Sequence, residues 1–134
     1  MSATIDVDVI RKTVASVKAF EKVAEEKDFA NFLGPAKELS ENAVKLVRLA
    51  TENSMIELAS KIRESVKNSM ASAKVALKDK SDESVQVFLQ QLKEVAIIIV
   101  KFTREIELKF AGHVSLTLFF IEHPYRIFSN SIVE

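Results

Sequence analysis

The chain has 134 residues, enough for one domain with its own core, and it contains no cysteine, which excludes disulfides, thiol chemistry and zinc–thiolate sites. Nineteen basic and nineteen acidic side chains cancel, so the net charge gives no reason to expect nucleic acid or an anionic membrane as a bulk partner. No apolar run approaches the roughly 20 residues that span a bilayer, and the N-terminus lacks a signal-peptide pattern, so we expect a cytoplasmic protein without an integral-membrane segment.

The first predicted helix starts near Asp8, whose carboxylate suits an N-terminal cap, and it runs for about five turns ahead of the break at Gly34-Pro35. Its apolar stripe, with spacings of three and four, consists of Ile10, Thr13, Val14, Val17, Phe20 and Ala24. Gly34-Pro35 is the clearest break, and proline fits the first turn of a second helix that follows it. The stripe of this second helix consists of Leu39, Ala43, Leu46, Val47 and Ala50.

The third predicted helix begins at Ser54, because Ser54 and Glu57 have the S-x-x-E spacing of a capping box. Its stripe consists of Ile56, Ala59, Ile62, Val66, Met70, Ala73 and Leu77. Ser81 or Asp82 caps a fourth helix from about Glu83 to Phe110, and Gly112 stops it. The stripe of the fourth helix consists of Val85, Phe88, Leu92, Ala96, Ile99, Thr103, Ile106 and Phe110.

Four helices of comparable length with short connections predict an all-α fold, an antiparallel up-down four-helix bundle over residues 1–112. Residues 113–134 form an apolar C-terminal tail that does not fit this pattern, because they first alternate like a strand and then break at His123-Pro124. Three interpretations of the tail stay open: a fifth segment folded over the bundle, a partner-binding tail, or sequence from outside the domain.

The usual motifs of catalysis are missing. Both histidines, His113 and His123, lie in the tail, and no Glu-x-x-His pair lies inside a helix. The sequence also lacks a glycine-rich phosphate loop, a nucleophile elbow and an HExxH motif. We therefore expect no metal, no cofactor and no enzymatic activity, and we favour a binding or scaffolding function.

The four consecutive apolar residues at 97–100 generate the binding hypothesis. With Ile99 in the core, Ile98 and Val100 lie on its flanks and Ile97 points outward among cations. A groove between the first and fourth helices, apolar with basic rims, would bind an acidic amphipathic helix. The predicted partner-binding residues are Lys18, Lys22, Lys93, Ile97, Val100, Lys101 and Arg104. For each cation alone, solvated surface is the alternative, and the tail or a second copy of the bundle are alternative covers for Ile97.

Scattered residues on two helices resemble a known family. The residues that carry the resemblance are Val9-Ile10-Arg11, Thr13, Lys18, Gln90-Gln91, Ala96, Ile99, Lys101 and Arg104. They resemble the C-terminal focal-adhesion-targeting-like domain of the GIT Arf GTPase-activating proteins, and related fungal polarisome scaffolds are the nearest alternative. The resemblance covers residues 8–110 in outline and is best in the first and fourth helices.

This resemblance implies a four-helix bundle that binds LD motifs, the leucine- and aspartate-rich helices of paxillin-type adaptors, between the first and fourth helices. Lys18, Lys101 and Arg104 stand at matching positions, whereas Lys22 and Lys93 depend on helical geometry alone. It also implies a scaffold at the cell cortex or at adhesion or polarity sites. A second groove between the second and third helices is a minor alternative, with candidate border residues Lys45, Arg48, Lys61 and Lys67.

Two other binding classes compete with the adaptor interpretation. Vinculin and talin rods consist of similar bundles, so a cytoskeletal module or a self-associating bundle that forms homodimers is the closer alternative. A bundle that binds a membrane surface ranks third, because it requires a continuous basic face with exposed aromatic side chains. In this chain the basic residues are interspersed with acidic ones.

Overall fold

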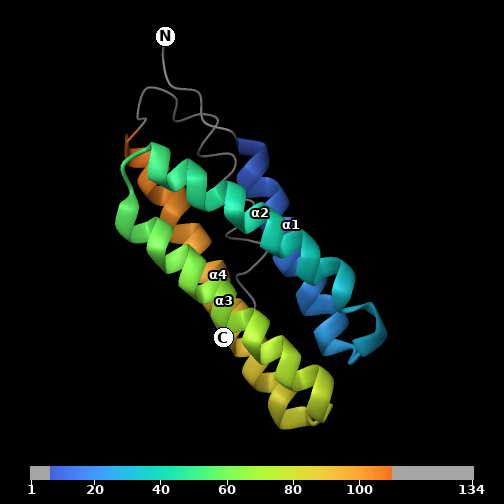
Figure 1. The fold of residues 1–134 in the computed structure, drawn as a ribbon. Helices are drawn as coiled ribbons and strands as arrows, with labels where there is room; N and C mark the ends of the chain where they lie inside the picture. The colour runs from blue at the N-terminus through green and yellow to red at the C-terminus, as the bar shows by residue number, and fades with distance from the viewer. Residues whose placement is uncertain (1–6, 110–134) are drawn as a thin grey trace.

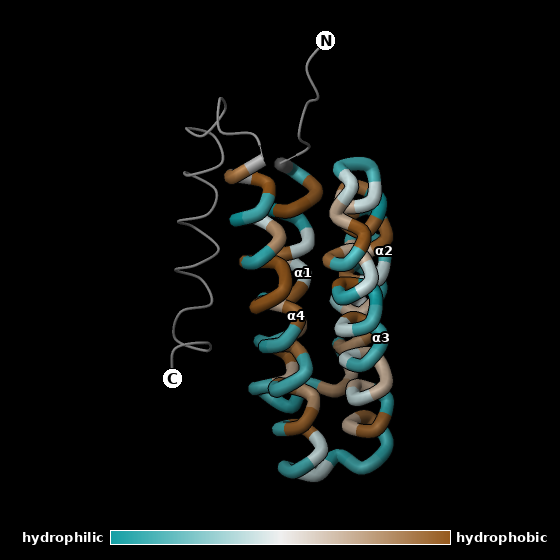
Figure 2. Tube along the Cα trace, turned by 90° about the vertical axis from the view of Figure 1, so that its left-hand side faces the viewer, coloured by the Kyte–Doolittle hydropathy of each residue, from teal (hydrophilic) through white to brown (hydrophobic). Residues whose placement is uncertain are grey.

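The computed structural model describes residues 7–109, and all regular secondary structure among them is helical (Figure 1). Helix α1 spans Val7–Glu25, the short 3₁₀ helix η1 spans Phe29–Asn31, α2 spans Leu33–Glu52, α3 spans Ile56–Asp79 and α4 spans Asp82–Lys109. Packing joins α1 to α2, α2 to α3, α3 to α4 and α4 to α1. Figure 2 shows two layers, one of α1 with α4 and one of α2 with α3. The expected all-α class is confirmed for this part of the chain.

The core follows the predicted apolar stripes closely in α1 and α4. All six stripe residues of α1 are buried, and so are the seven of α4 from Val85 to Ile106. The buried face of α4 is wider than one stripe, because α4 packs against both α1 and α3. Val95 and Phe102 are therefore buried as well. Phe110, the last residue of the predicted stripe, lies outside the described residues.

Two predicted core positions of α3 are wrong. Ile56 is 60% exposed and Leu77 is 38% exposed. Ile56 is the first residue of α3 and Leu77 lies in its last turn. At the ends of a helix, fewer neighbouring side chains are present to cover the apolar stripe. Stripe residues at the two ends of α3 are therefore exposed although they continue the same periodicity. The small residues Ser69, Ala73 and Ala76 in the second half of α3 are all buried against the other helices.

A cluster of phenylalanine rings joins α1, the α1–α2 connection and α4. The centroid distances are 4.6 Å between Phe20 and Phe88, 5.4 Å between Phe20 and Phe32, and 5.6 Å between Phe32 and Phe88. All three rings are fully buried. Phe32 precedes α2 and belongs to no predicted stripe, so the sequence pattern missed a central core residue.

The chain leaves α1 at Lys27, well before Gly34-Pro35. Lys27 has a left-handed backbone with φ of 54°. Its N–H donates to the carbonyl of Ala24 (3.0 Å), and the next N–H donates to that of Val23 (2.8 Å), which is the Schellman arrangement. Gly34-Pro35 lies inside the first turn of α2, where proline needs no N–H partner. The prediction that the second helix follows the proline is wrong, because it begins at Leu33.

Ser54 ends α2 and does not cap α3. Its φ is 63°, its N–H donates to the carbonyl of Thr51 (3.0 Å), and the N–H of Met55 donates to that of Ala50 (2.8 Å). This is a second Schellman motif with a non-glycine residue in the left-handed position. The N-cap of α3 is Met55, without a side-chain hydrogen bond, so the predicted capping box of Ser54 with Glu57 is wrong.

Ser81 caps α4, which confirms one of the two caps predicted for this helix. The N–H of Ser84 donates to the Ser81 hydroxyl oxygen (3.1 Å), and the Ser84 hydroxyl donates to the Ser81 carbonyl (2.9 Å). Lys80, which precedes the cap, is the third left-handed residue, with φ of 56°. An ion pair between Lys27 and Asp82 joins the end of α1 to the start of α4. Gly112 and the predicted tail at 113–134 lie outside the described residues.

Replacing Ser54 with glycine should stabilise the protein, because glycine adopts the left-handed backbone without the steric cost of about 1–2 kcal/mol that other residues bear. We expect Ser54→Gly to raise the free energy of unfolding by about 1 kcal/mol in urea denaturation. Ser60→Gly, at an exposed position inside α3, is the matched control and should lower it by about 0.5 kcal/mol. A loss of stability in Ser54→Gly would contradict the assigned α2 terminus.

Phe32→Ala should cost about 3 to 5 kcal/mol of unfolding free energy, because it opens a cavity between two other buried rings. The neighbouring Leu33 is 79% exposed, so Leu33→Ala should change stability by no more than about 0.5 kcal/mol. Chemical denaturation followed by circular dichroism measures both. Equal effects of the two variants would contradict the position of Phe32 in the core.

Candidate functional site

The surface shared by α1 and α4 brings cations of both helices to one carboxylate. Glu21 is half-buried. Its carboxylate interacts electrostatically with Lys93 of α4 and with Lys18 of α1. Burial raises the pKa of Glu21 above its ordinary value, the negative charge of Glu25 raises it further, and the two lysines oppose the rise. The predicted basic groove therefore contains an acidic side chain that the sequence pattern had not indicated, although Glu21 lies three residues after Lys18.

The first helix has a shallow hollow at this place. Its described lining residues are Ala15, Lys18, Ala19, Glu21, Lys22 and Glu25. Lys18 and Lys22 thus lie together, as predicted, but each has an acidic neighbour in the same hollow. An acidic peptide approaching this side would meet two carboxylates as well as two cations.

The predicted residues of α4 divide between different surroundings. Lys101 and Arg104 are exposed and line a hollow with the start of α3, including Leu58 and Lys61. No described residue of α1 lines that hollow. Val100 is half-buried and packs against the core. Ile97 is also half-buried, so the expectation of an exposed isoleucine is wrong.

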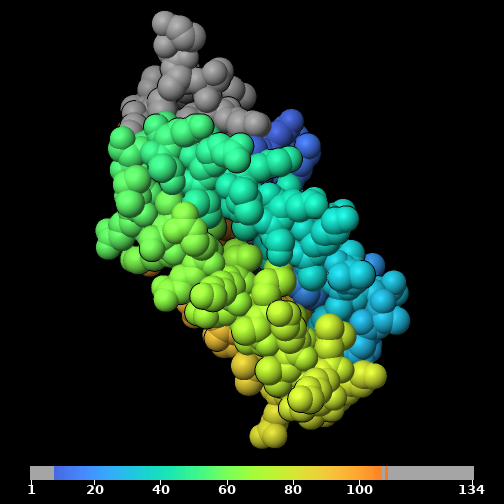
Figure 3. Space-filling view, viewed as in Figure 1, coloured from blue at the N-terminus to red at the C-terminus, as the bar shows by residue number. Residues whose placement is uncertain are grey.

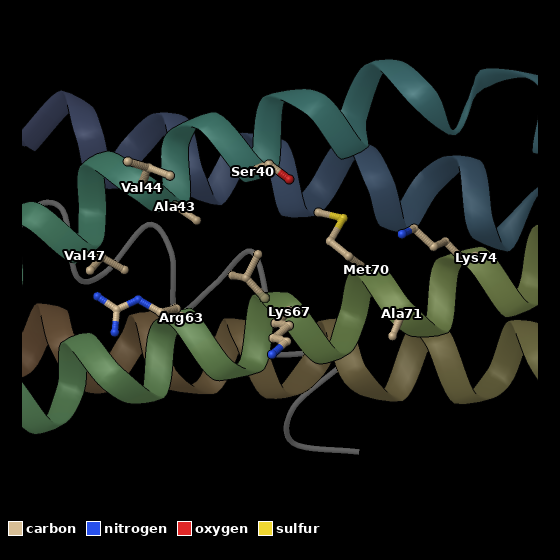
Figure 4. A pocket seen from close by; sticks show the side chains of 10 residues that line it. Ser40, Ala43, Val44, Val47, Arg63, Lys67, Met70, Ala71 and Lys74 are labelled. Atoms are coloured by element: carbon tan, nitrogen blue, oxygen red, sulfur yellow. The ribbon is translucent and has the colours of Figure 1, made fainter.

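A larger hollow lies along the seam between α2 and α3, with a volume of about 640 Å³. Figure 3 shows the surface hollowed between these two helices, and Figure 4 shows side chains of both helices along it. We call it the α2–α3 seam; its lining residues are Ser40, Ala43, Val44, Val47, Arg63, Val66, Lys67, Met70, Ala71 and Lys74. Six of these ten side chains are apolar and three are basic, and none of the lining residues between 7 and 109 is acidic. The seam combines apolar surface with positive charge.

Apolar side chains of the seam are accessible to solvent. Val44 in the middle of α2 is 59% exposed, and Val47 and Met70 are half-buried. In Figure 4, Met70 extends from α3 into the space below Ser40, between the two helices. A partner that covers this surface would gain the free energy of burying apolar groups.

The cations of the seam all come from α3. Arg63, Lys67 and Lys74 share one side of α3, because spacings of four and seven residues return to the same helical face. Within residues 7–109 none of these three side chains forms an ion pair. Of the four border residues suggested by the sequence, only Lys67 lines this seam, and Arg63 and Lys74 were missed. Their i, i+4, i+11 spacing was the signal that would have indicated them.

Residues 7–109 contain neither a membrane-spanning helix nor a cluster of metal-binding side chains. Over residues 7–109, no helix is both long enough and apolar enough to cross a membrane. In the same part of the chain, no three side chains of His, Cys, Asp or Glu come together in a way that would hold a metal ion.

Comparison with known proteins found no similarity: no family model, no curated protein and no solved structure matches this chain.

Glu21→Gln should stabilise the protein at neutral pH, because it removes a charge that burial and Glu25 disfavour. The folded state raises the pKa of Glu21 above 4.5, so it binds this proton more tightly than the unfolded state. Stability therefore falls as pH rises from about 4.5 through the raised pKa, and the gain from Glu21→Gln should be small in acid and largest above that range.

Urea denaturation of both proteins between pH 4 and pH 8 measures this difference. Glu94→Gln, which makes the same change at an exposed position on α4, is the matched control. A stabilisation by Glu21→Gln that grows as the pH falls would contradict the assigned environment of Glu21.

Proposed function

We propose that this protein is a non-enzymatic adaptor domain that binds an acidic amphipathic helix of the LD-motif type. The α2–α3 seam is the docking surface that its geometry supports best. One observation carries this proposal: the exposed Val44 and half-buried apolar side chains lie beside three cations that have no carboxylate partner among the described residues. A helix with leucines on one face and carboxylates along its edges is complementary to such a surface.

The surface between α1 and α4 was the docking site expected from the sequence, and it is the second candidate. Lys18 and Lys93 on that surface already interact electrostatically with the carboxylate of Glu21. An acidic peptide would have to compete with Glu21 and would be repelled by Glu25. The cations of the seam form no ion pair with a carboxylate within residues 7–109, which favours the seam as the site for an acidic partner.

The proposed class of fold is an up-down bundle like the focal-adhesion-targeting domain. Successive helices are in contact and joined by short connections, and the chain reverses direction from each helix to the next in Figure 1. This arrangement leaves long seams between neighbouring helices, in which another helix fits lengthwise. By the resemblance in helices α1 and α4, the proposed setting is a cytoplasmic scaffold at the cell cortex or at adhesion or polarity sites.

The spacing of the cations gives the dimensions of the partner. Arg63 and Lys74 lie about 16 Å apart along the helix axis, which corresponds to roughly three turns of a bound helix. Acidic residues spread over three turns of the partner would therefore reach all three cations. Because these pairs lie at the solvent-exposed edges, each contributes about 0.2–1 kcal/mol, and added salt should weaken binding.

Reversing two of the seam charges tests the proposal. The probe is a synthetic 14-residue helical peptide with leucines on one face and aspartates along its edges. Arg63→Glu with Lys67→Glu should raise the dissociation constant about tenfold or more, because two attractions become repulsions. Lys101→Glu with Arg104→Glu makes the same change of charge on α4 and should have a smaller effect. Isothermal titration calorimetry measures the affinities, and circular dichroism verifies folding.

The reverse pattern, with a loss of affinity only in the α4 variant, would contradict docking at the seam. Equal losses in both variants would indicate non-specific attraction to positive charge. If the peptide does not bind the unmodified protein, the adaptor function is wrong. Analytical ultracentrifugation then tests the competing proposal of self-association.

A further inference from the structure

A second hollow continues the α2–α3 seam toward the end of the bundle where α1 meets α2. Its volume is about 250 Å³, and nine of its ten described lining residues are apolar. Its walls come from the phenylalanine cluster, from the start of α2 and from the last turns of α3. We call it the aromatic pocket; the residues used below are Phe29, Phe32, Leu33, Ala36 and Leu77.

The pocket and the seam are continuous. Met70 and Lys74 line both of them. Along α2 the combined surface runs from Val47 to Leu33, and along α3 it runs from Arg63 to Leu77. Each of these stretches spans about 21 Å, so the two walls match in length, and a helix of about 14 residues would extend from one end to the other.

The size and chemistry of the pocket indicate which kind of partner group fits into it. Sites for drug-sized molecules usually measure about 300–1,000 Å³, and this pocket is smaller. Phe29 and Phe32 have ring centroids 5.4 Å apart, and Lys74 is the only charged lining residue within residues 7–109. At the rim, Leu33 is 79% exposed and Leu77 is 38% exposed. These features fit one large apolar side chain of a partner, packed among aromatic and aliphatic groups.

We propose that the aromatic pocket holds a bulky apolar side chain near one end of the acidic helix and thereby fixes the register of that helix in the seam. This inference rests on the proposed function, because the helix itself occupies the adjoining seam. The cations of α3 attract the edges of the partner but lie on one face at several similar positions, so they permit sliding. A single apolar side chain held in the pocket at one end prevents such sliding.

The chain contains no tryptophan, so a tryptophan in a peptide reports only on its own surroundings. Three versions of the 14-residue leucine–aspartate peptide are compared: one with alanine at both ends, one with tryptophan near the N-terminus and one with tryptophan near the C-terminus. One of the two tryptophan peptides should bind about tenfold more tightly than the alanine peptide and its emission should shift to shorter wavelength. The other should show neither change.

Filling the pocket provides the matched control. Ala36→Leu adds a side chain to the pocket wall and should abolish the tenfold gain and the emission shift, so that this variant binds the tryptophan peptides no more tightly than the alanine peptide. Ala19→Leu adds the same side chain to the exposed surface of α1 and should alter neither. Circular dichroism and thermal unfolding verify that both variants fold.

The outcomes separate the two proposals. Binding of the alanine peptide without any gain from tryptophan at either end overturns the anchor and leaves the adaptor function standing. A gain that survives Ala36→Leu also overturns the anchor, because the tryptophan then lies elsewhere. If none of the three peptides binds, the proposed function fails and the anchor fails with it.

Discussion

The burial of Phe32 between Phe20 and Phe88 is the contact on which the rest of this structure depends. It fixes the point at which the chain, after leaving α1, enters α2. The start of α2 determines how α2 lies along α3 and therefore which side chains meet at their seam. The same ring forms a wall of the aromatic pocket. The burial of Phe32 thus contributes both to the stability of the fold and to the shape of the proposed docking surface.

The seam is hollow because small residues line both of its walls. Ser40 and Ala43 on α2 and Ala71 on α3 leave space that larger side chains would fill. Elsewhere on α3, Ser69 and Ala76 are buried, where their small size allows neighbouring helices to approach closely. Small side chains therefore serve two purposes on one helix, close packing on its inner side and an open surface on its outer side. In the proposed complex, Arg63, Lys67 and Lys74, which form no ion pair within residues 7–109, would favour a partner with negative charge.

Helical periodicity predicted most of the fold, because a buried stripe repeats on a scale that a sequence displays directly. Helix ends were harder to predict, since Lys27, Ser54 and Lys80 occupy left-handed positions for which glycine is the usual signal. Phe32 was missed because it lies outside any stripe. The candidate site was predicted only in part. Which helices face each other decides whether a cation of one meets a carboxylate of another, as Lys93 of α4 does at Glu21 of α1, and this requires the three-dimensional arrangement.

The most direct test of the central claim is a nuclear magnetic resonance titration of the isotope-labelled full chain with the leucine–aspartate peptide. If the partner docks at the seam, the largest chemical-shift changes occur at Val44, Val47, Lys67 and Met70, with few changes on the outer side of α1. Changes concentrated at Lys18, Lys93 and Ile97 would contradict it and would place the docking site between α1 and α4. Absence of changes anywhere would contradict the adaptor function itself.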